Sequence, residues 1–340
     1  MAGKAGGLAR AAVVGAGLIG GSVLLRLRDA GLDVAGWDPD PEVRRRLRDR
    51  GVPAPDAVEE TVAGRDVVFL CGPLPTLPTT LARVAAATDD RCVLTDVGSV
   101  KAEVATAATG QGLGHRFVPG HPMAGADRAG LDAADPALLD GAAWVLCPGP
   151  AGTGAFRRLA ALLVGVFHAR VVPMSAPEHD GAAALASHVP HVLAASLAGT
   201  VGRSTLRDAV LTLAAGSFAD GTRVAGGPPE RTANMLLGNR DRVLAELAAV
   251  GAFLDELTEA LRAGDAGALT ERFAQGRATR SALRDRVFTA HRREFPAAEH
   301  AGELAYLREL GAAGGHLSAV RESGGAVTYT GHLPATTPLG

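Results

Sequence analysis

A glycine-rich turn near the start of the chain constrains its fold more than any other feature. The residues Gly15-Ala16-Gly17-Leu18-Ile19-Gly20 follow a short apolar run (11–15) and open a helical stretch (18–30). In a strand–turn–helix unit, such glycines close the turn and let the backbone approach a pyrophosphate at the helix N-terminus. The expected cofactor-binding residues are Gly15, Gly17, Leu18, Ile19, Gly20 and Asp38.

Asp38 indicates which dinucleotide this turn would bind. It ends the second apolar run (33–37) and follows Gly20 by 18 positions. A carboxylate there hydrogen-bonds the adenine-ribose hydroxyls and repels a 2′-phosphate, which favours NAD over NADP. Two alternatives stay open: a glycine turn with no ligand, and a softening of this preference by the arginines at 44–46.

The remaining pattern predicts two architectures in succession. Short apolar runs alternate with helical stretches up to Pro173, which is typical of a doubly wound parallel sheet. Further strands are expected at 66–71, 91–96, 116–119, 142–147 and 168–172. Only helical periodicity follows, at 178–201, 204–218, 230–262, 265–294 and 297–313. We therefore predict a Rossmann-type domain at 1–174, an all-helical substrate-binding and dimerisation domain at 175–322, and a tail at 323–340 that contains one β-like run (326–330).

Composition excludes several classes of protein. The net charge of −2 offers no basic field for nucleic acid, and apolar runs are interrupted before the length of a membrane span. Three widely spaced cysteines favour a reducing cytoplasm over a disulfide framework or a zinc site. Only two lysines, Lys4 and Lys101, are available for lysine-dependent chemistry.

Two residues that follow predicted strands are candidates for catalysis. Ser99 lies in Asp96-Val97-Gly98-Ser99-Val100-Lys101, and His121 lies in Gly120-His121-Pro122-Met123-Ala124-Gly125. Ligands of open α/β sheets bind at the carboxyl ends of the strands, which is where both residues fall. Taken alone, Ser99 also suits a helix N-cap and His121 a structural core position.

Two motifs in the helical half carry further polar groups. In Ser187-His188-Val189-Pro190-His191 the histidines are three apart, and Pro190 should kink the helix against a cavity. A metal site is disfavoured because neither an HExxH pattern nor a nearby cysteine completes it. In Phe218-Ala219-Asp220-Gly221-Thr222-Arg223, Asp220 can orient the Arg223 guanidinium to grip a carboxylate, although a surface ion pair would give the same spacing.

Together these motifs resemble the prephenate dehydrogenase (TyrA) family of tyrosine biosynthesis. The matching segments are 15–22, 96–101, 120–125, 179–191 and 218–223, in the family's order over about residues 10 to 295. The resemblance implies a cytoplasmic homodimeric oxidoreductase of aromatic amino acid biosynthesis. It would oxidatively decarboxylate prephenate to 4-hydroxyphenylpyruvate with NAD. It further implies that His121 accepts the hydroxyl proton and Ser99 orients that hydroxyl. Arg223, held by Asp220, would grip a substrate carboxylate, and Ser187, His188 and His191 would line the pocket.

Several alternatives remain beside this interpretation. Arogenate, which would yield tyrosine, and 4-amino-4-deoxyprephenate of antibiotic pathways differ from prephenate only in small polar groups. A β-hydroxyacid dehydrogenase is disfavoured because that family resembles this one but uses a helical-domain lysine, and none follows Lys101. A non-catalytic NAD-binding dimer is disfavoured because the chemical residues are all present. Asp127 stands where family members often carry glutamate, and no regulatory ACT domain is expected after the helical half.

Overall fold

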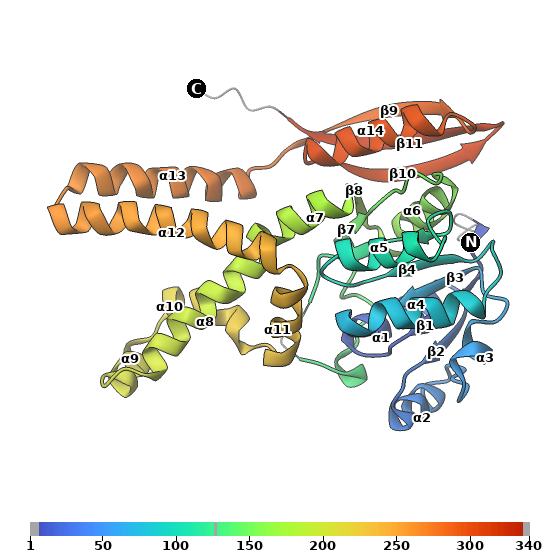
Figure 1. The fold of residues 1–340 in the computed structure, drawn as a ribbon, viewed down its shortest axis with the longest axis horizontal. Coiled ribbons are helices and arrows are strands. Elements are labelled where there is room, and N and C mark those ends of the chain that lie inside the picture. The colour runs from blue at the N-terminus through green and yellow to red at the C-terminus, as the bar shows by residue number, and fades with distance from the viewer. Residues whose placement is uncertain (1–6, 126–127, 336–340) are drawn as a thin grey trace.

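The computed structural model describes residues 7–125 and 128–335, and its first half is a parallel sheet covered by helices (Figure 1). The strand order is β2-β1-β3-β4-β5, and every neighbouring pair is parallel. The strands are β1 (Arg10–Val14), β2 (Asp33–Trp37), β3 (Val67–Leu70), β4 (Val93–Asp96) and β5 (Phe117–Val118). The helices are α1 (Leu18–Asp29), α2 (Pro41–Asp49), α3 (Val58–Val62), α4 (Leu77–Ala86) and α5 (Ala102–Gly110), with 3-10 turns at Leu74–Thr76 and Leu131–Ala133. The predicted doubly wound sheet is confirmed.

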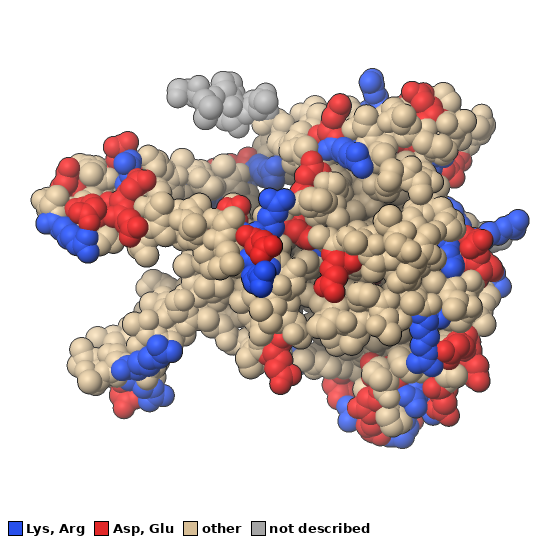
Figure 2. All heavy atoms as spheres, in the orientation of Figure 1, with Lys and Arg blue, Asp and Glu red and all other residues tan. Residues whose placement is uncertain are grey.

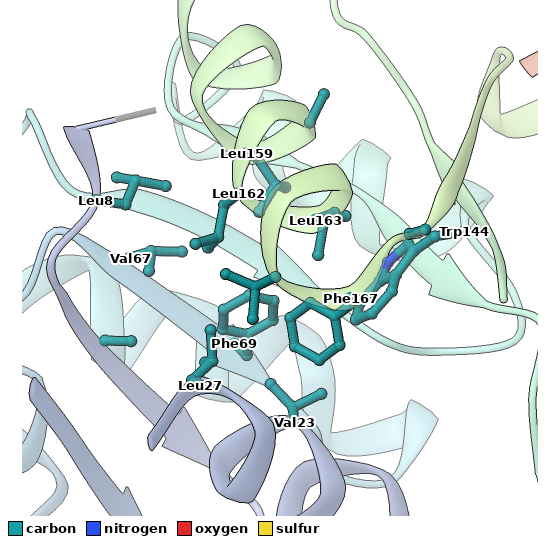
Figure 3. Packing of buried hydrophobic residues seen from close by; sticks show 14 of the residues in the cluster. Leu8, Val23, Leu27, Val67, Phe69, Trp144, Leu159, Leu162, Leu163 and Phe167 are labelled. Carbon is teal, nitrogen blue, oxygen red and sulfur yellow. The ribbon is translucent and has the colours of Figure 1, made fainter. Parts of the chain in front are cut away.

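Helix α6 (Gly154–Phe167) closes the core of this half against β3 and α1 (Figure 3). Phe167 meets Trp144 edge to face at a centroid distance of 5.2 Å, and Trp144 meets Phe69 at 6.4 Å. Each of these rings is almost fully buried. Burial of a large apolar side chain contributes about 1.5 to 3 kcal/mol, so this cluster fixes the sheet that carries the candidate site.

A second sheet joins the middle of the chain to its end. Its order is β6-β7-β8-β10-β11-β9, with β7 and β8 parallel and the other pairs antiparallel. The strands are β6 (Gly120–Pro122), β7 (Ala143–Leu146), β8 (Arg170–Pro173), β9 (Phe288–Pro296), β10 (His316–Ser323) and β11 (Ala326–Pro334), and α14 (His300–Ala312) lies between β9 and β10 in the chain. The prediction of helix throughout 265–294 is therefore wrong beyond Arg284, and the β-like run at 326–330 belongs to a nine-residue strand. The region expected to be all-helical at 175–322 also contains β9 and most of β10. The strands expected at 142–147 and 168–172 exist, but they lie in this second sheet.

The segment 288–296 lacks a strand pattern in its sequence because β9 is a largely exposed edge strand. Arg292 and Arg293 face solvent, so the segment lacks the alternation of a half-buried strand. Its anchor is at the far end, where the buried Phe295 packs against the rings of Tyr306 and Tyr329. That contact is long-range and leaves no local periodicity to read.

The helices between the two parts of the second sheet extend away from the α/β half in two arms (Figure 1). They are α7 (Ala176–Ala183), a π-helical turn (Ala184–His188), α8 (Val189–Gly202), α9 (Arg207–Leu213), α10 (Gly216–Thr222), a 3-10 turn (Arg223–Gly226), α11 (Pro229–Gly238), α12 (Arg240–Ala263) and α13 (Ala266–Arg284). The single helix predicted at 230–262 is divided at Asn239, whose side chain instead bonds the α7 region. The helix predicted at 204–218 is divided at 214–215.

The continuous helix Ala176–Gly202, made of α7, the π-helical turn and α8, concerns the expectation that the chain has no membrane-spanning segment. By length and composition alone this helix could cross a membrane, and 28% of its apolar stretch is buried in the structure. A helix with an apolar face for a protein partner meets the same criterion. Its first turns carry the buried polar residues His179 and Asp180, which bond the α/β half.

Candidate active site

The glycine turn has the geometry that a dinucleotide phosphate requires. Gly15 adopts φ +98°, and a Cβ on Gly20 would lie 1.8 Å from the Gly15 carbonyl oxygen, so both positions require glycine. Gly17 is the N-cap of α1 and has open space where a Cβ would be. The first turn of α1 contains no acid; its Leu18 is buried, and Ile19 packs against the apolar core. The helix N-terminus is thus suited to an anion.

Asp38 lies where the sequence places it, at the end of β2 beside this turn. Its Oδ2 accepts a 2.8 Å hydrogen bond from the Ala16 N–H, and its Oδ1 accepts one of 3.0 Å from the Asp40 N–H. The carboxylate is therefore held in place while its remaining lone pairs can accept from ribose hydroxyls. The residues present fit NAD.

The arginines at 44–46 are engaged with acids and carbonyls of the protein. Arg44 donates to the Asp38 carbonyl at 2.7 Å. Arg45 pairs with Glu42 at 2.6 Å, and Arg46 pairs with Asp132 at 2.8 Å. Guanidinium groups held in this way are not poised to bind a 2′-phosphate, so the structure supports the preference for NAD.

A buried ion pair fixes the β4–α5 loop that carries Ser99. Lys101 and Asp96 are both fully buried, and the Lys101 ammonium bonds the Asp96 carboxylate and, at 2.9 Å, the Gly120 carbonyl. Asp96 also accepts the Gly120 N–H at 3.1 Å. Ser99 is half-buried within this loop, and Lys101, not Ser99, is the N-cap of α5. The capping interpretation of Ser99 is thus wrong.

His121 follows Gly120 on β6 and is held by residues of α7. Its Nδ1 lies 2.8 Å from Nε2 of His179, whose Nδ1 lies 2.7 Å from the Asp180 carboxylate. Burial, together with the nearby His179, Lys101 and His188, lowers the pKa of His121 well below its usual range. His121 is therefore neutral at pH 7 and chemically a base rather than a packed structural cation.

The π-helical turn before Pro190 positions the next two histidines. Proline lacks an N–H, so the helix cannot continue its regular bonding here, and such turns are frequent at functional sites. His188 is fully buried, and burial lowers its pKa to about 4. Asn239 donates to the Asp180 carbonyl at 2.7 Å and contacts Nδ1 of His188 at 3.1 Å. Within the described residues, Nε2 of His188 has no hydrogen-bond partner.

His191 and Ser187 occupy the outer side of the same turn, and both are half-buried. Nδ1 of His191 donates to the Ser187 carbonyl at 2.8 Å, which leaves Nε2 as an acceptor. His188 of this turn is among the groups that lower the pKa of His121.

Asp220 on α10 and Arg223 in the following 3-10 turn are both exposed and lie on the α8 side of the helical region. Their roles in substrate binding stay predictions. Asp127 lies outside the described residues.

Besides Lys101, four buried residues of the site carried no predicted role: Asp96, His179, Asp180 and Asn239. The first three lay inside motifs already recognised, at 96–101 and 179–191, but only the fold shows what they contact. Asn239 stood inside an expected helix and left no signal. Within the described residues, no group of three or more histidines, cysteines or acids could hold a metal ion.

Comparisons with known proteins agree with this geometry. A family model described as prephenate dehydrogenase, nucleotide-binding domain, matches residues 23–172, and one described as prephenate dehydrogenase, dimerization domain, matches 175–275. Cyclohexadienyl dehydrogenase of Zymomonas mobilis is 32% identical over 279 residues, which covers 80% of this chain and 95% of that enzyme.

Two solved structures are similar over most of their length. Prephenate dehydrogenase from A. aeolicus, in complex with hydroxyphenyl propionate and NAD⁺, has a TM-score of 0.72 and 27% identity, covering 81% of this chain and 98% of that one. Synechocystis arogenate dehydrogenase has a TM-score of 0.69 and 27% identity, covering 81% and 99%. The resemblance inferred from the motifs is therefore confirmed, and the chain belongs to the prephenate dehydrogenase (TyrA) family of NAD-dependent oxidoreductases.

Proposed function

We propose that this enzyme oxidises prephenate, with decarboxylation, to 4-hydroxyphenylpyruvate for tyrosine biosynthesis. The observation that carries the proposal is the neutral, buried His121, whose neighbour Gly120 is hydrogen-bonded to Asp96 at the end of β4 in the parallel sheet. A neutral imidazole near pH 7 is suited to accept the proton of the ring hydroxyl as hydride leaves the same carbon. NAD⁺, when bound at the glycine turn, would supply the hydride acceptor.

The remaining site residues position the substrate. The buried pair of Lys101 and Asp96 holds both the Ser99 loop and the backbone at Gly120, so Ser99 and His121 keep a fixed relation. Ser99 orients the hydroxyl toward His121. Loss of the ring carboxylate yields an aromatic ring, so that step needs no separate acid.

The substrate side chain is bound from the helical region. Arg223, oriented by Asp220, grips a carboxylate, because a guanidinium binds that group bidentately. Ser187, His188 and His191 line the pocket. Nε2 of His188, which has no hydrogen-bond partner in the part of the chain that the structure describes, and the acceptor Nε2 of His191 supply polar contacts.

The active enzyme is a homodimer formed through the helical arms. Thirteen of the sixteen large apolar side chains that the described residues expose lie between positions 185 and 283. Figure 2 shows charged side chains gathered at the ends of both arms, with uncharged surface between them. An isolated soluble chain rarely exposes so much apolar surface, and a match to a dimerization domain covers the same residues.

The enzyme works in the cytoplasm. Cys71, Cys92 and Cys147 are unpaired and largely buried, as expected of a reducing compartment. Its partners are a small-molecule substrate and a second copy of the chain, with no role for nucleic acid or a membrane.

Kinetics on three substrates test the proposal. Prephenate, arogenate and 4-amino-4-deoxyprephenate are compared with NAD⁺ and with NADP⁺ by the rise in reduced-cofactor absorbance. We expect the highest kcat/KM with prephenate and NAD⁺. A higher value with arogenate, whose dehydrogenase from Synechocystis is structurally similar, would reassign the substrate. The absence of turnover with all three would refute the reaction.

A further inference from the structure

Three buried side chains form a continuous hydrogen-bonded line behind the expected base. His121 is 9% exposed, His179 2% and Asp180 3%. The two rings meet edge to face, with centroids 5.1 Å apart and planes 78° apart. The line runs from β6 into α7 and ends at the first turn of α5, where Asp180 accepts the N–H groups of Lys101 and Ala102 at 2.8 Å each.

The hydrogen bonds along this line have one donor-to-acceptor direction. Burial alone would raise the pKa of Asp180, but hydrogen bonds from His179 and from the Lys101 and Ala102 N–H groups lower it below its usual range. Asp180 is thus an ionised acceptor, and Nδ1 of His179 must carry hydrogen. With one proton on each ring, Nε2 of His179 accepts from Nδ1 of His121. Nε2 of His121 keeps its lone pair.

The surroundings of His121 disfavour the protonated form of its ring. Burial disfavours its charged form, and the nearby His179, Lys101 and His188 lower its pKa further. His179 differs because it directly contacts an ionised carboxylate at 2.7 Å. A positive charge that reaches His179 becomes half of a buried, hydrogen-bonded ion pair.

We propose that His179 and Asp180 are positioning residues that set the tautomer of His121 and take over its proton during the reaction. The inference rests on the proposed function. As the substrate O–H breaks, its proton bonds to Nε2 of His121, and the electron pair of the carbon–hydrogen bond leaves as hydride. The Nδ1 proton of His121 then moves to Nε2 of His179. His121 ends neutral, and the charge lies beside Asp180.

Two variants of the full-length enzyme separate this role from simple packing. In His179→Gln, the side-chain oxygen can still accept from Nδ1 of His121, but it cannot take the proton. We expect kcat to fall about 10- to 100-fold while KM for substrate and NAD⁺ changes little.

In Asp180→Asn, the amide can donate to Nδ1 of His179 and so reverse both tautomers. A reversed tautomer typically lowers the rate by about 10⁴ in comparable triads, so kcat should fall further than in His179→Gln. Ser175→Ala is the matched control on the same helix. It removes the capping box of α7 and should lower the melting temperature while leaving kcat unchanged.

NMR of enzyme whose histidine ring nitrogens carry nitrogen-15 shows which nitrogen of each ring is protonated, and it needs no substrate. The spectrum of His121→Asn assigns the signals of His121. We expect Nε2 of His121 to be unprotonated at pH 7 in the wild type and protonated in Asp180→Asn. A protonated Nε2 in the wild type, or an unchanged kcat in His179→Gln, would overturn the proposal. An enzyme that turned over none of the three substrates would refute the proposed function instead.

Discussion

At the residue scale, the candidate site depends on buried polar side chains whose partners come from distant parts of the chain. Asp180 illustrates this, because it caps α5 across 78 positions while it bonds its own neighbour His179. Such groups are costly to bury unless each is bonded, so removing one changes the geometry of the others. Single substitutions can therefore separate chemistry from binding.

His121→Asn should abolish most catalysis while sparing binding. A positioned general base contributes about 10² to 10⁴ in rate, and this contribution exists mainly in the transition state. We expect kcat to fall by that factor and KM to move little, measured with saturating NAD⁺ and varied substrate. A near wild-type kcat would show that another group accepts the proton.

Arg223→Ala should show the opposite behaviour. It removes a grip on a carboxylate that is present in both ground and transition states. KM should rise most, with a binding cost of about 2 to 4 kcal/mol if the contact is desolvated. Asp220→Ala should give a weaker form of the same effect, because it only releases the orientation of the guanidinium. An unchanged KM in Arg223→Ala would exclude it as the anchor.

Asp38 should set the cofactor preference. The wild type should have a higher kcat/KM with NAD⁺ than with NADP⁺, and Asp38→Asn should narrow that ratio by removing a charge that repels the 2′-phosphate. Glu259→Gln, in an exposed pair with Arg262 on α12 outside the nucleotide-binding half, is the control and should leave the ratio unchanged. If the wild type prefers NADP⁺, the arginines at 44–46 are the residues to examine next.

At the scale of elements, the end of the chain is attached to the α/β half by a buried charged cluster. Glu303 of α14 is fully buried and pairs with Arg157 of α6, and the Tyr329 and Thr153 hydroxyls donate to it. Breaking a buried pair on one side leaves the other charge uncompensated. The cluster therefore secures β9, β10 and β11, although residues after 275 lie outside both family matches.

Glu303→Gln should lower the free energy of unfolding by roughly 3 to 5 kcal/mol at pH 7. Burial alone would raise the pKa of Glu303, but hydrogen bonds from Arg157, Thr153 and Tyr329 lower it overall. Its contribution is thus present above the unfolded-state pKa and is lost as pH falls through the lower folded-state pKa. The variant should lose part of this acid sensitivity.

Urea unfolding at pH 7 and at about pH 4 checks this prediction. Glu322→Gln is the matched control, because Glu322 contacts the same Arg157 at 3.3 Å but is 49% exposed. We expect it to cost less than about 1 kcal/mol. Equal losses in the two variants would mean that Glu303 contributes no more than a surface pair.

These elements show which parts of the fold and of the candidate site could be predicted from the sequence. The glycine turn, Asp38 and the strands up to β8, except β6, were predictable because their signals are local: a turn, a periodicity and a charge at a fixed spacing. The residues Asp96 and His179 could be seen in motifs, but their partners depend on tertiary contacts. Strand β9 and the break at Asn239 were not predictable, because long-range packing and one side-chain bond decide them.

At the scale of the whole molecule, the exposed apolar arms predict a dimer. Light scattering at micromolar concentration should give twice the chain mass of 34.5 kDa. Leu213→Asp, at a leucine that is 81% exposed on α9, should weaken the dimer, because a charge would enter the apolar interface. Leu333→Asp, on β11 outside the arms, should not. A monomeric wild type, or a dimer unaffected by Leu213→Asp, would contradict an interface through the arms.

The return of the chain to the second sheet has a mechanical consequence. The helical arms leave the α/β half after β8 and rejoin it at β9, and β8 and β9 belong to one sheet. The arms are therefore attached by two covalent connections rather than one. A rigid body held at two points can rotate only about the line that joins them. A hinge motion of the arms relative to the α/β half would thus be limited to one axis.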